Sequence, residues 1–420
     1  MNKKMYAQSE NKKLKFPKGF LWGTAISAYQ VEGNNTHADW WKWEQKGKIK
    51  IKSGNACDYY RRFKSDHDFL QELGCNTFRL SVEWARVEPE EGKFSKKELA
   101  HYREVLLDLK KRDIKIQLTL WWWTSPIWFS EKYGFHKKKS VEVFARYAQK
   151  VVDELGDLID IYQTFNEPMV PLGQGYLSGQ FPPGIRNPWK LLKAANNIAK
   201  AHKRVYEIIK NKYPEVEVGI SYLYNWYESE NLGFLIAIVN RVSKWFRVDL
   251  IDGKIGENLD FIGVQYYRLG KIKYDWGNMG KLDAKNQIYY GFTIEEDKNN
   301  LMKWISYPEG IYRVLTEIKK NRNTPIYITE NGVPTDVGLN DQERIVFIKE
   351  HLKYMHKAIS EGVDVRGYNH WSLLDNFEWL YGYTPRFGLV EIDFSTMERK
   401  PRKSFYEYAK ICKNNELDLN

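Results

Sequence analysis

Two glutamates follow short apolar segments of the chain, and each has an asparagine beside it. Glu167 stands in Thr164-Phe-Asn-Glu-Pro168, and Glu330 stands in Ile328-Thr-Glu-Asn-Gly332. Two carboxyl groups that face each other across an aromatic-walled pocket can cleave an acetal, because one protonates the leaving oxygen while the other attacks or activates water. A glutamate at a strand end is also often a structural hydrogen-bonding group, so the pattern alone leaves both roles open.

Eight apolar segments rich in β-branched and aromatic residues recur along the chain, and patterns typical of amphipathic helices lie between them. Such runs are typical of parallel strands that are covered on both faces. The segments are 20–25, 77–82, 114–120, 161–165, 216–221, 261–266, 325–329 and 365–371. This alternation predicts an α/β fold, a single (β/α)8 TIM barrel with long βα loops. Active sites of such barrels lie at the C-terminal strand ends, which is where Glu167 and Glu330 fall.

The formal net charge of the 420 residues is +11, and its distribution argues against a nucleic-acid partner. Residues 1–18 contribute +5 and residues 399–420 contribute +3, which leaves a nearly balanced body. Basic ends of this kind are typical of solvated tails, and no nucleic-acid-binding motif accompanies them. No linker rich in Pro, Gly or Ser divides the chain. We therefore expect a basic extension at 1–13, a catalytic barrel at 14–410 and a C-terminal tail at 411–420.

Cysteine usage and hydropathy predict a cytoplasmic protein. The three cysteines form no disulfide framework, and the Lys-rich N-terminus contains no apolar segment of a secretory leader. The most apolar stretch, 232–239, is far shorter than the ~20 residues of a membrane-spanning helix. This stretch continues to residue 251, and two alternatives stay open for it. It forms either a helix at the surface, with possible contact to a membrane, or a helix that packs on the barrel. No phosphate-binding loop, dinucleotide fingerprint or metal-ligand spacing is present, so we expect neither cofactor nor metal.

Several segments carry motifs similar to those of one enzyme family. Besides the two glutamate motifs, they are Phe16-Pro-Lys-Gly-Phe-Leu-Trp-Gly-Thr-Ala25, Gln30-Val-Glu-Gly33, Phe78-Arg-Leu-Ser-Val-Glu-Trp-Ala-Arg86, Trp371-Ser-Leu-Leu-Asp-Asn-Phe-Glu-Trp379 and Arg386-Phe-Gly-Leu389. From about residue 14 to about residue 408, the chain resembles glycoside hydrolase family 1, the retaining β-glycosidases. The resemblance implies hydrolysis of terminal non-reducing β-D-glycosidic bonds, in glucosides, galactosides or related compounds, by retaining double displacement.

The resemblance also implies the roles of the two glutamates and their neighbours. Glu330 would be the nucleophile, and Glu167 the general acid and then the general base, with carboxyl groups about 5–5.5 Å apart. Arg79 and Tyr267 would hydrogen-bond Glu330 and keep it ionised. The charge of Glu330 would raise the pKa of Glu167 until the nucleophile is glycosylated.

The remaining implied residues bind the sugar. Asn166, which also supports the nucleophile, would donate to the 2-hydroxyl, and Trp371 would stack beneath the ring. Gln30, Glu378 and Trp379 would hold the outer hydroxyls. Family members that act on 6-phosphorylated sugars have Ser and Lys in this last loop. The carboxylate of Glu378 would repel a phosphate, so we expect unphosphorylated sugars.

Two positions depart from the family pattern. Trp122 occupies the place of a His that donates to the sugar 3-hydroxyl, and Gln265 occupies that of an Asn near the nucleophile. We expect both to line a reshaped sugar subsite that turns over ordinary glucosides slowly or prefers a less usual sugar. Two alternatives to hydrolysis stay open: a transglycosylase, and a sugar-binding barrel whose turnover Trp122 and Gln265 have weakened. The sequence leaves the preferred sugar, the aglycone and the oligomeric state undetermined.

Overall fold

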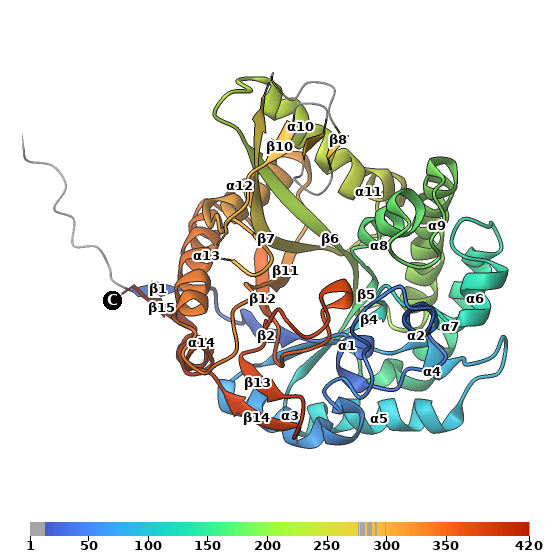
Figure 1. The fold of residues 1–420 in the computed structure, drawn as a ribbon. Coiled ribbons are helices and arrows are strands. Elements are labelled where there is room, and N and C mark those ends of the chain that lie inside the picture. The colour runs from blue at the N-terminus through green and yellow to red at the C-terminus, as the bar shows by residue number, and fades with distance from the viewer. Residues whose placement is uncertain are drawn as a thin grey trace, which may run out of the picture.

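The computed structural model describes residues 13–419, apart from 276, 278–281, 284–287, 290–291 and 299. Eight parallel strands form a closed ring in which each pairs with the next along the chain and the last pairs with the first (Figure 1). They are β2 (Leu21–Ala25), β3 (Thr77–Ser81), β4 (Lys115–Trp121), β5 (Ile161–Asn166), β6 (Glu217–Glu228), β7 (Phe261–Tyr274), β11 (Ile326–Asn331) and β12 (Val365–Trp371). All eight predicted strands are confirmed.

A helix follows each barrel strand and covers the outside of the ring (Figure 1). These helices are α3 (Tyr59–Leu73), α5 (Lys96–Lys111), α7 (Ser140–Leu155), α9 (Pro188–Lys212), α11 (Leu250–Ile255), α12 (Glu309–Asn321), α13 (Gln342–Ser360) and α14 (Lys403–Asn414). Local sequence fixes where several of them begin. The Asn187 side chain accepts a hydrogen bond from the Lys190 amide, and Pro188 occupies the first turn of α9. The predicted (β/α)8 barrel is thus the observed fold.

Long connections follow the C-terminal ends of the strands, as expected. They contain short elements: α1 (Ala28–Glu32), α2 (Asp39–Gln45), α4 (Trp84–Val87), α6 (Ile127–Lys132), α8 (Met169–Gly173), η2 (Gln174–Ser178), α10 (Leu235–Lys244), η3 (Trp245–Asp249), η5 (Trp379–Tyr381), β13 (Val390–Asp393) and β14 (Glu398–Pro401). The turn η1 (Gly156–Leu158) instead precedes β5. The stretch whose placement the sequence left open forms α10, η3 and the start of α11. No residue of α10 is buried, whereas Val248 and Ile251 are buried in the core of the barrel, so each alternative holds for one part of the stretch.

Two barrel strands run further than their apolar segments predict. β6 and β7 continue beyond the ring, and β7 pairs there in antiparallel fashion with β10 (Phe292–Ile294), next to β9 (Ile288–Tyr289) and β8 (Leu282–Asp283). Burial on both faces ends where these strands leave the ring. Continuous apolar sequence is therefore no longer required there, although backbone pairing continues.

The first and the last strand of the described chain lie side by side. β1 (Lys13–Lys15) pairs in antiparallel fashion with β15 (Glu416–Asp418). Residues 411–418 of the expected tail lie in α14, β15 and the turn between them, whereas all of the expected basic extension except Lys13 falls outside the described residues. The division into extension, barrel and tail stays a prediction.

Candidate active site

A cavity of about 660 Å³ opens at the C-terminal ends of the strands. It brings together most of the side chains that the sequence selects from distant parts of the chain. Those that line it are Gln30, Trp122, Asn166, Glu167, Tyr267, Glu330, Trp371, Glu378 and Trp379. Arg79 and Gln265 do not line the cavity but are fully buried, where they contact Glu330.

Glu330, at the end of β11, is held by three donors. Arg79 Nη1 and Gln265 Nε2 each donate to its Oε1 at 2.5 Å, and the Tyr267 hydroxyl donates to Oε2. Burial raises the pKa of this carboxyl, while the Arg79 charge and the hydrogen bonds from Tyr267 and Arg79 oppose the rise. These contacts orient the carboxylate and stabilise its ionised form.

Glu167 has a different environment. No described side chain donates a hydrogen bond to its carboxyl group, and its backbone has a φ of 41°, in the left-handed region. Burial raises its pKa well above the usual range, and the negative charge of Glu330 raises it further. Of the two carboxyl groups, Glu167 is therefore the one whose ionisation is more strongly disfavoured.

Asn166 is oriented by the groups beneath it. Its Oδ1 accepts hydrogen bonds from Arg79 Nη2 at 2.5 Å and from Gln265 Nε2 at 2.7 Å. Because the oxygen faces these donors, the amide nitrogen is the group left to face a ligand in the cavity. Gln265, predicted to bind substrate, instead bridges Asn166 and Glu330.

Gln30 and Glu378 form a polar wall. Gln30 Nε2 donates to the Phe377 carbonyl at 3.0 Å and lies 3.3 Å from Glu378 Oε2. Burial, followed by the charge of Glu330, raises the pKa of Glu378 to about 8. This carboxyl is thus largely protonated at neutral pH, so the phosphate repulsion expected from the sequence becomes strong only in alkaline solution. Trp379 stacks on Tyr29 with ring planes 8° apart.

Trp122 packs between two other predicted site residues. The Arg79 guanidinium carbon lies 4.0 Å from its ring centroid, and the Trp371 ring lies on another side, with centroids 5.5 Å apart and planes tilted by 30°. Trp122 is only 5% exposed. Its ring therefore fills part of the space beside the nucleophile, where a histidine would leave more room.

Several cavity residues were missed by the sequence analysis. Among them are Phe246, Arg247, Arg268, Met302 and Trp304. Arg268 directly follows Tyr267, so a search beyond each strand end would have found it. Arg247 lies in η3, which does not directly follow a barrel strand, so a search of the strand ends does not find it. Among the described residues, no group of three or more His, Cys, Asp or Glu side chains is arranged to hold a metal ion.

A parallel barrel with two buried carboxyl groups of unequal environment in one aromatic-walled cavity is the arrangement expected of a glycoside-cleaving enzyme. The model of Glycosyl hydrolase family 1 matches residues 12–233 and 249–417. The chain belongs to this family.

Curated and solved relatives agree with this assignment. Beta-glucosidase A of Thermotoga maritima is 31% identical, with 96% of this chain and 99% of that protein covered. The beta-galactosidase of Sulfolobus acidocaldarius is 31% identical, with 96% of each covered. The structure of a beta-glycosidase from Pyrococcus horikoshii, 38% identical, superposes with a TM-score of 0.86 over 96% of each chain. A Thermotoga maritima beta-glucosidase in complex with deoxynojirimycin, 30% identical, has a TM-score of 0.85 over 96% of this chain and 99% of that one. This protein is accordingly an enzyme, a retaining glycosyl hydrolase whose substrate is a small-molecule glycoside.

Proposed function

We propose that the enzyme hydrolyses terminal non-reducing β-D-glycosidic bonds of glucosides, galactosides or related compounds, with Glu330 as nucleophile and Glu167 as general acid and base. The observation that carries the role assignment is the asymmetry of the two carboxyl groups. Glu330 accepts hydrogen bonds from Arg79, Gln265 and Tyr267, whereas no described side chain donates to Glu167, whose pKa is raised well above its usual range. The names of the relatives support glucosides and galactosides as substrates.

The reaction proceeds in two displacements at one carbon. A Glu330 oxygen bonds to the anomeric carbon as the bond to the leaving oxygen breaks, and Glu167 gives its proton to that oxygen. The glycosyl ester neutralises Glu330, so the electrostatic contribution that raises the pKa of Glu167 disappears. Glu167 then takes a proton from water, whose oxygen bonds to the anomeric carbon while the ester breaks, and both carboxyl groups return to their starting states.

The sugar binds among the side chains that face the nucleophile. Asn166 presents its amide nitrogen to the 2-hydroxyl, Gln30 and Glu378 provide polar atoms for the outer hydroxyls together with Trp379, and Trp371 provides an aromatic face. Trp122 narrows this subsite on the side of Arg79.

A panel of 2-deoxy-2-fluoro glycosides tests the assignment. The fluorine slows both displacements, so the glycosyl ester accumulates and can be located by peptide mapping. We expect labelling of Glu330 and, across the panel, the fastest labelling by the preferred sugar. Labelling of any other residue would overturn the role of Glu330. Product ratios with an added sugar acceptor distinguish hydrolysis from transglycosylation, and no turnover of any β-glycoside would favour a sugar-binding protein.

Replacing Trp122 by His is expected to raise kcat/KM for an aryl β-glucoside by about tenfold. The smaller ring relieves the narrowed subsite and adds a second nitrogen that can hydrogen-bond a sugar hydroxyl, an interaction worth about 1 kcal/mol or more. Trp122→Phe serves as the matched control, because it also reduces the ring but adds no hydrogen-bonding nitrogen, and we expect from it only the smaller part of the gain that comes from the added space. An equal response of the two variants would count against the hydroxyl contact.

We also propose that the protein acts in the cytoplasm. All three cysteines are buried free thiols, as is usual in a reducing compartment. Among the described helices, none combines the length and apolar character needed to cross a bilayer. Separation of the cytosolic fraction from membranes and secreted material, followed by activity measurement, tests the location.

A further inference from the structure

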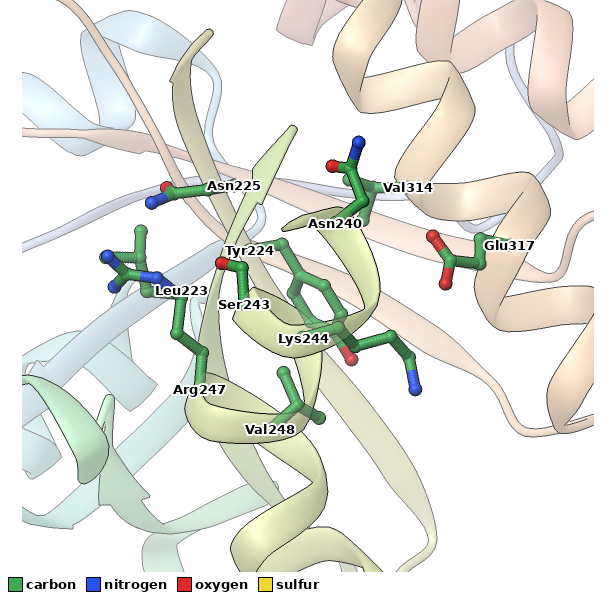
Figure 2. A pocket seen from close by; sticks show the side chains of 10 residues that line it. All are labelled: Leu223, Tyr224, Asn225, Asn240, Ser243, Lys244, Arg247, Val248, Val314 and Glu317. Atoms are coloured by element: carbon green, nitrogen blue, oxygen red, sulfur yellow. The ribbon is translucent and has the colours of Figure 1, made fainter. Parts of the chain in front are cut away.

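Two arginines from different elements line one part of the cavity. Arg268 lies on β7, one residue beyond Tyr267, and Arg247 lies on η3. Figure 2 shows Arg247 reaching from this helical segment toward Leu223 and Asn225 of β6. Both side chains are half-buried and both line the cavity.

Neither arginine forms an ion pair with a described acidic residue. Arg268 donates no hydrogen bond to a described group, and its guanidinium carbon lies 5.4 Å from the ring centroid of Trp304. With the Asn225 amide turned so that its oxygen faces Arg247, that oxygen accepts from Arg247 Nε at 3.2 Å and Nη2 at 3.0 Å. The Tyr227 hydroxyl lies beside the same guanidinium, whose charge and hydrogen bond lower the pKa of Tyr227. Elsewhere, buried arginines meet carboxylates, in the pairs Arg79–Glu330, Arg344–Asp341 and Arg402–Asp375.

The charges around this pair do not neutralise it. Burial lowers the pKa of Arg268, and the charge of Arg247 also lowers it, so the two cations are within electrostatic reach of each other. Burial raises the pKa values of Glu167 and Glu378, which disfavours their ionised forms, while Glu330 is paired with Arg79. Tyr227 is the first of the groups that raise the pKa of Arg268, followed by Tyr381 and Glu296, and Glu296 forms an ion pair with Lys303 at 2.7 Å. No described carboxylate is therefore paired with either arginine in the cavity.

The charge of Arg247 relates it to the leaving group. This charge lowers the pKa of Glu167, the group proposed to protonate the leaving oxygen, whereas Glu330 is the charged group that acts on Glu378 in the sugar-binding wall. The apolar side chains Phe246, Met302 and Trp304 line the same cavity as the two arginines.

We propose that this part of the cavity binds a negatively charged aglycone, one that carries a phosphate or a carboxylate group. Two half-buried guanidinium groups without acidic partners are costly in a cavity, and an oxyanion removes that cost by accepting charge-assisted hydrogen bonds from both. A phosphate fits best because its oxygens can accept from both arginines at once. The inference rests on the proposed function, since the aglycone leaves on the side of Glu167.

Two matched aryl glucosides test the proposal. One is 3-(phosphonomethyl)phenyl β-D-glucoside and the other is its neutral dimethyl phosphonate ester. In the wild type at low salt we expect kcat/KM to be at least tenfold higher for the anionic compound, and this preference to decrease as salt is added. Arg268→Gln should remove most of the preference, Arg268→Lys should retain part of it, and the double variant with Arg247→Gln should abolish it. Arg61→Gln is the control, because Arg61 is exposed on α3 outside the barrel, and it should leave the ratio unchanged.

The outcomes separate this inference from the proposed function. Cleavage of the neutral glucoside with no preference for the anionic one, or a preference unchanged in Arg268→Gln, would overturn the arginine site and leave glycoside hydrolysis intact. If neither compound is cleaved, the affinities of both compounds for the Glu330→Gln variant, measured by calorimetry, test the arginine site. Tighter binding of the anionic compound would support the site without the proposed turnover, and equal binding would overturn it.

A phosphate of this kind could belong to a soluble compound or to a lipid headgroup. Inhibition of aryl glucoside hydrolysis by glycerol 3-phosphate in solution is compared with inhibition by phosphatidylglycerol vesicles, in the wild type and in Arg268→Gln. Stronger Arg268-dependent inhibition by glycerol 3-phosphate would assign the anion to a small molecule. Stronger Arg268-dependent inhibition by vesicles would assign it to a lipid.

Discussion

The Glu330→Gln variant is expected to hydrolyse an aryl β-glucoside about 10⁵-fold more slowly than the wild type, the order of loss that follows removal of a covalent nucleophile. The amide has nearly the same shape and can still accept a hydrogen bond from Arg79. It cannot form the glycosyl ester, because it carries no negative charge to attack the anomeric carbon. Initial rates with a nitrophenyl glucoside measure the loss, and a 2-deoxy-2-fluoro glucoside should no longer label the protein.

Glu83→Gln is a suitable control for this substitution. Glu83 is also a buried glutamate that follows a barrel strand, but its carboxyl group accepts hydrogen bonds from the Ala85 amide and the Thr124 hydroxyl and does not line the cavity. Burial raises its pKa to about 7, so a neutral amide is a close substitute near neutral pH. We expect its activity to stay within about tenfold of the wild type. Comparable losses in the two variants would indicate general damage to the barrel and contradict a specific role for Glu330.

Replacing Glu167 by Ala is expected to slow glycosides with poor leaving groups by about 10²–10⁴-fold, the usual contribution of a positioned general acid. Formation of the glycosyl ester should be slowed much less for a dinitrophenyl glycoside, because a good leaving group departs without a proton. This dependence on the leaving group distinguishes loss of the acid from loss of the nucleophile. Added azide should restore turnover of the dinitrophenyl substrate and yield a β-glycosyl azide, since it needs no general base.

The pH profile gives an independent measure of the same role. The wild type requires protonated Glu167, so kcat/KM for a poor leaving group should decline as pH rises through the raised pKa of this carboxyl. The alanine variant lacks the titrating group and should lose this alkaline limb. An unchanged limb in Glu167→Ala would show that another group controls it. The trapped fluoroglycosyl enzyme should show a lower Glu167 pKa than the free enzyme, because the charge of Glu330 has been removed.

The two glutamates illustrate how one residue type can take the two proposed roles in a single cavity. Both are buried, which disfavours ionisation of each. Arg79, Gln265 and Tyr267 all contact Glu330, so the negative charge is best stabilised there. Once that charge is present it acts on Glu167. The order of the two pKa values therefore follows from the location of the donors.

The sequence by itself determined the barrel and the two carboxyl groups. The eight strands are buried on both faces, so their apolar segments are continuous and can be read locally. Glu167 and Glu330 follow two of these segments. Both therefore lie at the C-terminal end of the barrel, where the active sites of this fold are found. Their roles also required the motifs around them, because a strand end alone does not distinguish a catalytic glutamate from a structural one.

Only the tertiary structure decided which atoms meet. Gln265 could be recognised as unusual, but its contacts with Asn166 and Glu330 depend on the spacing of β5, β7 and β11. The same holds for Trp122, whose packing against Arg79 and Trp371 joins three strands. Arg247 and Arg268 come together from η3 and β7, and nothing in their local sequence marks the absence of acidic partners. Periodicity and propensity act over a few neighbouring residues, whereas these contacts join residues far apart in the chain and exist only once the ring has closed.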